Sequence, residues 1–130
     1  MTSAELTTWL ERYGQAWEAR DPDAVAALFT DDAAYYETPF GKPAQGRDGV
    51  RAYWAAATRN QRQVKFSFEV SSVAGEVGIA RWWAEYTREP TGLMARLDGI
   101  FLLEFDASGQ CRTLREWWHR AETPKGPGPI

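Results

Sequence analysis

The sequence predicts an α+β fold in which N-terminal helices pack on a strongly curved antiparallel sheet and close it into a cone with an open mouth. Two observations support this fold class. All helical patterns fall in the first half of the chain, and the second half consists of strand patterns separated by turn residues. With 130 residues, the chain suits one domain that buries roughly two thirds of its unfolded surface. We expect this domain to span residues 1–120.

The helices are predicted from apolar side chains that recur every three or four residues. The first helix covers residues 3–20. Its apolar positions are Leu6, Trp9, Leu10, Tyr13, Ala16 and Trp17. A short second helix follows Asp21, which can cap it, and begins with Pro22, which suits a first turn. A third helix spans about residues 47–59, and its apolar side carries Val50, Tyr53, Trp54 and Ala57.

The strands are predicted from β-branched and aromatic residues between Pro, Gly and Ser turns. They cover residues 33–37, 64–71, 77–89, 93–106 and 110–119. The last three form a meander with aromatic residues on both faces. Residues 38–46, with two Pro and two Gly, form a loop. Residues 121–130 are expected to be a flexible Pro/Gly tail.

Composition and charge exclude several classes of partner. The net charge of −3, with both signs interspersed, provides no basic stripe for nucleic acid. Cys111 is the only cysteine and His119 the only histidine, so we expect neither a disulfide nor a metal site. The N-terminus has no leader pattern and no segment reaches membrane-spanning length. A cytoplasmic protein with no nucleic-acid or membrane partner fits these properties.

Aromatic residues are unusually frequent, at 14 % with 7 Trp. Such a surplus of large rings can line a cavity for an apolar or aromatic small molecule. It is equally consistent with a bulky core and a hydrophobic interface.

The order of elements and three short segments point to a known family. The segments are 17–21 (WEARD), 27–33 (ALFTDDA) and 46–50 (GRDGV). Over residues 3–120 the chain resembles the nuclear transport factor 2-like superfamily, and within it the SnoaL-like branch. The resemblance implies a cone-shaped fold and a homodimer. It leaves the function open, because this cone hosts ketosteroid isomerases, polyketide cyclases, dehydratases, epoxide hydrolases and non-catalytic binding or assembly modules.

Resemblance to two enzyme types within this superfamily suggests residue roles. By similarity to ketosteroid isomerase, Tyr13 is the oxyanion-hole donor and Glu37 the general base, while the position of the second donor is occupied by Phe101. By similarity to limonene-epoxide-hydrolase-type enzymes, Glu116 is one of two catalytic carboxylates and Glu85 a possible counterpart.

The residues themselves suggest acid–base chemistry without a cofactor, because a carboxylate in an aromatic pocket has a raised pKa. The candidate catalytic residues are Tyr13, Glu37, Glu85 and Glu116. The expected pocket walls are Trp17, Tyr53, Trp54, Trp83, Phe101 and Trp118. The leading hypothesis is an isomerase-, cyclase- or dehydratase-type enzyme with Glu37 or Glu116 as base. The alternatives are a ligand-binding or assembly module, an epoxide-hydrolase-type enzyme, and carboxylates that only pair with arginines across strands.

The other face of the meander is expected to lie outside. Its apolar residues are Trp82, Tyr86, Ile100, Leu102 and Trp117. Because so much apolar surface is unfavourable in water, we expect a homodimer through this face. Asp98 is also expected to point outward and pair with an arginine, and His119 is expected on the outer face or rim.

Overall fold

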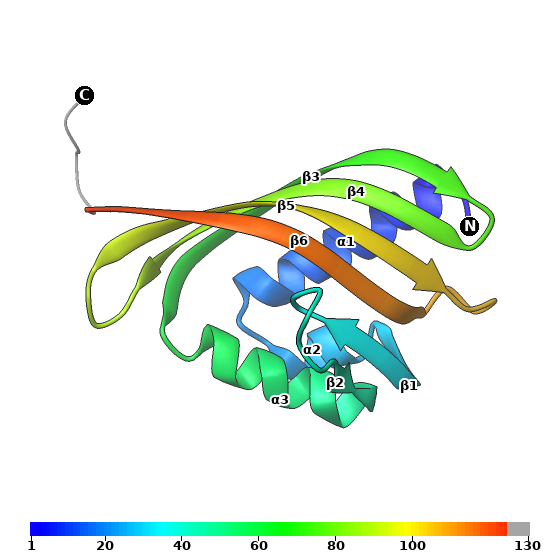
Figure 1. Ribbon diagram of the computed structural model, residues 1–130, viewed down its shortest axis with the longest axis horizontal. Coiled ribbons are helices and arrows are strands. Elements are labelled where there is room, and N and C mark those ends of the chain that lie inside the picture. The colour runs from blue at the N-terminus through cyan, green and yellow to red at the C-terminus, as the bar shows by residue number, and fades with distance from the viewer. Residues whose placement is uncertain (125–130) are drawn as a thin grey trace.

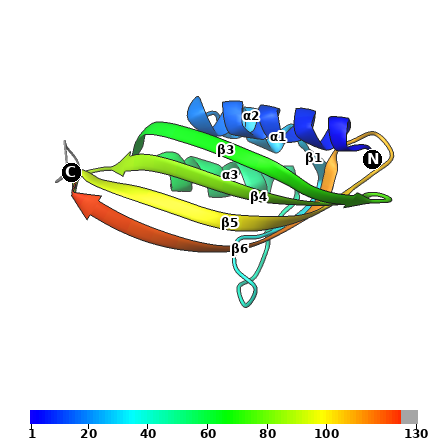
Figure 2. The same cartoon turned by 90° about the horizontal axis from the view of Figure 1, so that it is seen from above.

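The computed structural model describes residues 1–124 and has helices on one face of a curved, open sheet of six strands (Figures 1 and 2). The elements are α1 (Ser3–Glu18), α2 (Pro22–Ala26), β1 (Phe29–Tyr36), β2 (Ala44–Gln45), α3 (Gly46–Thr58), β3 (Gln61–Ala74), β4 (Val77–Arg88), β5 (Leu93–Phe105) and β6 (Cys111–Pro124). The strand order is β2-β1-β6-β5-β4-β3. The predicted fold class is confirmed.

Local signals account for the ends of the helices. Thr2 caps α1 in a capping box with Glu5, and Asp21 caps α2, whose first residue is Pro22. Helix α1 ends at Glu18, before the predicted end, because Arg20 adopts a positive φ of 51° that stops the helical path. This left-handed residue separates α1 from α2.

Three strands, β1, β3 and β6, are longer than the sequence predicts, and the extensions of β1 and β6 follow their pairing with neighbouring strands of the sheet. β1 begins at Phe29 and runs parallel to β6, with Tyr35 opposite Leu114. β6 continues to Pro124, pairing along β5 beyond His119. The assignment of Ala121–Pro124 to a flexible tail is therefore wrong. Residues 125–130 of that tail lie outside the described part of the chain.

The face of β4 that lies under the helices is the opposite of the one predicted. Trp82 is only 2 % exposed and Tyr86 only 7 %, so their placement on the outer face is wrong. Trp82 can lie on the inner face because Gly99 sits opposite it on β5, and a Cβ at Gly99 would approach the indole ring to 2.7 Å. Small Ala80 and Ala84 alternate with the two rings and leave room for the helices.

The outer face carries the remaining predicted residues. Ile100 and Trp117 are 39 % and 47 % exposed, and Leu102 lies on the same side, half-buried. Asp98 also points outward and pairs with Arg81. The homodimer expected through this face stays a prediction.

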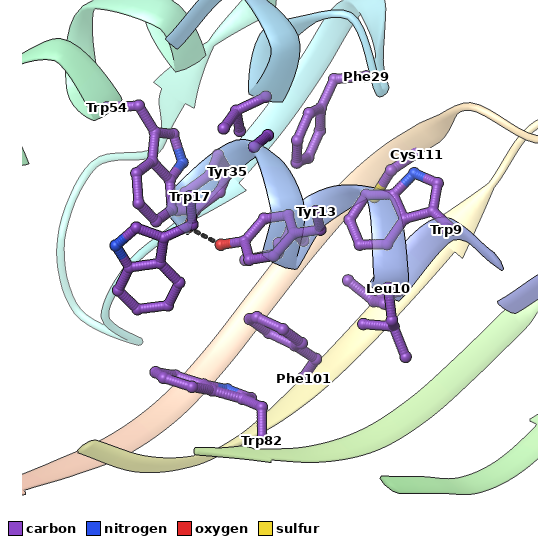
Figure 3. Packing of buried hydrophobic residues seen from close by; sticks show 14 of the residues in the cluster. Trp9, Leu10, Tyr13, Trp17, Phe29, Tyr35, Trp54, Trp82, Phe101 and Cys111 are labelled. Atoms are coloured by element: carbon purple, nitrogen blue, oxygen red, sulfur yellow. Dashed lines mark hydrogen bonds between the residues drawn. The ribbon is translucent and has the colours of Figure 1, made fainter. Parts of the chain in front are cut away.

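The core between sheet and helices is built largely from aromatic rings, with Tyr13 near its centre (Figure 3). Its ring stacks on Trp9, with centroids 5.3 Å apart, and meets Phe101 edge-to-face at 5.4 Å. Phe101 in turn stacks on Trp82 at 5.1 Å. These contacts fix the first helix against the inner face of the sheet.

Candidate functional site

A cavity of about 200 Å³ lies between α1, α3, the end of β1 and the inner face of the sheet. It is lined by Tyr13, Trp17, Tyr35, Glu37, Tyr53, Trp54, Ala57, Gln61, Trp82, Tyr86, Leu97, Glu116, Trp118 and Arg120. Aromatic rings form most of the wall. Since ligand pockets usually measure roughly 300–1,000 Å³, this one suits a small, flat molecule.

A chain of hydrogen bonds crosses the buried end of the cavity. The Tyr13 and Tyr35 hydroxyls are 2.9 Å apart, and the Tyr35 hydroxyl donates to Glu116 Oε2 at 3.4 Å. Because Tyr35 has one hydroxyl proton and gives it to Glu116, Tyr13 must donate to Tyr35. The three residues come from α1, β1 and β6, so the parallel β1–β6 pairing is what assembles them.

Two further hydrogen bonds hold the aromatic walls. The indole Nε1 of Trp118 donates to the backbone carbonyl of Glu37 at 3.0 Å, which ties β6 to the segment after β1. The indole Nε1 of Trp17 donates to Gln61 Oε1 at 2.7 Å. These two hydrogen bonds hold the rings of Trp17 and Trp118 in their orientations.

Burial raises the pKa of Glu116 well above the usual carboxyl range, and the nearby carboxylate of Glu37 raises it further. The hydrogen bond from Tyr35 acts in the opposite direction but does not offset burial. Burial therefore favours the protonated form of Glu116. Burial also raises the pKa values of Tyr13 and Tyr35, which stay neutral and can only donate or accept hydrogen bonds.

The structure brings three of the four candidate catalytic residues together and separates the fourth. Tyr13, Glu37 and Glu116 line the same cavity. Glu85 lies on the outer face of β4, with its Oε1 4.0 Å from Lys65 Nζ, so its predicted place in the pocket is wrong. The cause is strand alternation: Glu85 lies opposite Arg96 in the register that buries the neighbouring positions of β4.

Four of the six predicted wall residues line the cavity, namely Trp17, Tyr53, Trp54 and Trp118. Trp83 is on the outer face with the guanidinium of Arg81 over its ring at 4.6 Å, so its assignment to the wall is wrong. Phe101 is fully buried behind Trp82 and Tyr13 and supports the wall without being part of it.

Sequence reasoning missed several lining residues, chiefly Tyr35, Gln61, Tyr86 and Arg120. A signal existed for Tyr35, since it is two residues before Glu37 and alternation puts both on one side of β1. Arg120 was missed because β6 was expected to end one residue earlier. Gln61 follows the turn after α3, where no periodic pattern marks it.

A larger hollow of about 670 Å³ lies on the outer face, beside Trp83, Glu85, Asp98 and His119. It offers no comparable acid–base pair, because the Arg81 guanidinium lowers the pKa of Asp98 and holds it ionised.

Within residues 1–124, no cluster of His, Cys, Asp and Glu is suited to hold a metal ion. Over the same range, no helix is both long and apolar enough to span a membrane.

The raised pKa of Glu116 predicts a pH-dependent stability that Glu116→Gln removes. Above about pH 4.5 the folded protein keeps a proton that the unfolded chain releases. The free energy of unfolding of the wild type therefore falls as pH rises toward the folded-state pKa, by up to about 1.4 kcal/mol per pH unit. The glutamine side chain does not titrate, so the free energy of unfolding of this variant lacks that fall. The difference between the two proteins therefore shifts in favour of the variant as pH rises. Urea unfolding of both proteins between about pH 5 and pH 8 measures this difference. If the two free energies of unfolding change in parallel with pH, Glu116 does not have a raised pKa in the folded protein.

The comparisons with known proteins agree with this fold. A steroid Delta-isomerase of Nocardioides simplex is 29 % identical over 117 residues, covering 89 % of this chain and 91 % of the relative. The Delta 5-3-ketosteroid isomerase from Mycobacterium sp. superposes with a TM-score of 0.75 at 18 % identity, covering 92 % and 98 % of the two chains. The epoxide hydrolase/cyclase-like enzyme SalBIII of salinomycin pyran ring formation superposes with a TM-score of 0.76 at 18 % identity, covering 87 % and 89 %.

The family assignment rests on the sequence match itself. A family model for the SnoaL-like domain matches residues 10–113, from within α1 to the start of β6. The protein belongs to the SnoaL-like domain family.

Proposed function

We propose that this protein is a cofactor-independent enzyme that moves a proton next to a carbonyl group of an apolar or aromatic small molecule, as isomerases and cyclases do. The observation that supports it is the presence of two unlike carboxyl groups, Glu37 and Glu116, in one aromatic cavity. Paired carboxyl groups in different surroundings can take the separate roles of base and acid. The steroid isomerase relative favours the same reaction class.

Glu37 is the general base in this proposal. It is half-buried at the end of β1, and it is close enough to Glu116 and Tyr53 to raise the pKa of both. A carboxylate there can take a proton from the carbon beside the carbonyl and return it to another carbon. The step balances without another reactant, because the base takes one proton from carbon and returns one to carbon, and a proton held on the carboxyl group can exchange with solvent in between.

Glu116 is the hydrogen-bond donor to the carbonyl oxygen. Its Oε2 accepts from Tyr35, while its Oε1 has no hydrogen-bond partner within residues 1–124. The protonated carboxyl group can therefore donate to the oxygen that gains negative charge as the enolate forms. Tyr13, whose proton is engaged by Tyr35, is then a positioning residue that holds this donor, in place of the direct oxyanion role suggested by resemblance.

An epoxide-hydrolase mechanism based on Glu85 and Glu116 finds no support, because the two carboxyl groups lie on opposite faces of the sheet. A non-catalytic binding module is the remaining alternative. It differs from the enzyme in one measurable respect: it would bind a ligand in the cavity without exchanging the ligand's protons.

The proposal is tested with 2-tetralone, a small bicyclic ketone, by measuring how fast its α-protons are replaced by deuterium in D₂O. We expect the wild-type protein to accelerate the loss of the ketone's α-proton signals in NMR spectra. We also expect 2-naphthol, a flat mimic of the enol, to inhibit this exchange. Binding of 2-naphthol without any acceleration would favour the binding module and contradict the proposed catalysis.

A further inference from the structure

Arg120 stands at the mouth of the cavity. It follows Glu116 and Trp118 on the same side of β6, because alternate residues of a strand share a face. Its partner across the sheet is Leu97 of β5, which also lines the cavity. No other Lys or Arg lines the cavity within the described part of the chain.

The guanidinium of Arg120 has no partner among residues 1–124, neither an ion pair nor a hydrogen bond. The acidic residue two positions further on the same face, Glu122, is already engaged, because Arg88 binds both of its oxygens at 3.0 and 2.8 Å. Arg81, Arg47 and Arg51 likewise each pair with an aspartate. Arg120 therefore differs from most arginines of this chain in two respects. Its guanidinium N–H donors have no partner among the described residues, and its side chain lines the cavity.

The charges inside the cavity decide where an anion can bind. Glu37 and Glu116 occupy the inner part, and the proposed chemistry needs Glu37 ionised, so a second negative group there would be repelled. Aromatic rings cover the rest of the wall and favour an apolar body. A planar carboxylate is suited to the two parallel N–H donors of a guanidinium.

We propose that the natural ligand is a small aromatic or apolar carboxylate, whose ring system fills the cavity while its carboxylate binds Arg120 at the mouth. This inference rests on the proposed function only in assuming that the ligand occupies the same cavity. Arg120 is then a residue that selects the ligand and takes no part in the proton transfer.

The test compares two probes of matched shape, 2-naphthoate and its neutral amide 2-naphthamide, by isothermal titration calorimetry. The wild type is expected to bind the carboxylate about ten-fold more tightly, and Arg120→Gln to reduce this preference to about two-fold or less. Added salt should weaken the preference of the wild type, since the arginine is exposed to solvent.

Arg96→Gln is the matched control. Arg96 precedes Leu97 on β5 and lies on the outer face, so the change removes the same charge from a neighbouring position outside the cavity. The preference for 2-naphthoate should persist in this variant. Equal affinity of the wild type for the two probes, a preference that survives Arg120→Gln, or no binding of either probe would each overturn the inference.

This outcome is separable from that of the proposed function. Exchange into the neutral 2-tetralone depends on Glu37 and Glu116 and is expected to survive Arg120→Gln. A failed exchange assay together with an Arg120-dependent preference for 2-naphthoate counts against catalysis alone. Normal exchange without that preference counts against the carboxylate ligand alone.

Discussion

Glu37→Gln is expected to lower the turnover number for 2-tetralone exchange by roughly 10²–10⁴-fold, the range typical for loss of a general base. Glutamine keeps the size of the side chain but cannot accept a proton from carbon. The change should leave the Trp118 hydrogen bond intact, because that bond is made to the backbone carbonyl of Glu37. Rates are compared at saturating ketone, with circular dichroism and urea unfolding as checks of the fold.

Glu85→Gln provides the control for this variant. It removes the same charge from the outer face of β4, where the side chain is 41 % exposed beside Lys65. Turnover should stay at the wild-type level. Equal losses in both variants would indicate an unspecific effect of charge, and full activity of Glu37→Gln would remove Glu37 from the mechanism.

Phe101→Ala is expected to lower the free energy of unfolding by about 3–5 kcal/mol, the usual cost of truncating a buried aromatic residue. Phe101 is 0 % exposed and packs against both Trp82 and Tyr13. Its loss leaves a void behind the wall of the cavity that the surroundings close only in part. Since domains are stable by only about 5–15 kcal/mol, urea unfolding should detect the change easily.

Phe40→Ala is the matched control, because the same substitution is made at a side chain that is 100 % exposed. Its free energy of unfolding should lie within about 0.5 kcal/mol of the wild type. A loss below about 1 kcal/mol in Phe101→Ala would contradict the packing of the inner face described above.

The sequence was sufficient for features that depend on neighbouring residues. The apolar stripe of α1 and the cap at Asp21 are local, and the turns of the meander mark where β4 and β5 end and where β5 and β6 begin. The inward orientation of Glu116 and Trp118 also follows from alternation along one strand. These predictions needed no knowledge of which segments pair across the sheet.

The errors on β4 have a single origin, the choice of which face lies inside. Aromatic residues occupy both faces, so polarity alone does not decide. The register does decide, because Trp83 lies opposite Asp98, which in turn lies opposite His119, and both were expected to point outward. Applying that constraint across the hairpin would have placed Trp83 and Glu85 outside and Trp82 and Tyr86 inside.

The remaining features that the sequence did not predict depend on contacts between different parts of the chain. The early start of β1 and the late end of β6 come from pairing with β6 and β5, and the residues of these extensions carry no strand pattern of their own. Tyr35 joins the hydrogen-bond chain only because β1 lies parallel to β6. The central part of the candidate site is therefore a property of the sheet topology.

The parallel pairing of β1 with β6 also determines when this protein can acquire its site during synthesis. Tyr35 and Glu116 are 81 residues apart, so the loop between them must close before the cavity exists. Until β6 has emerged from the ribosome, the aromatic side of the helices that packs on the sheet is exposed. Such a surface is prone to aggregation. Such non-local closure is slow compared with the local pairing of β3, β4 and β5.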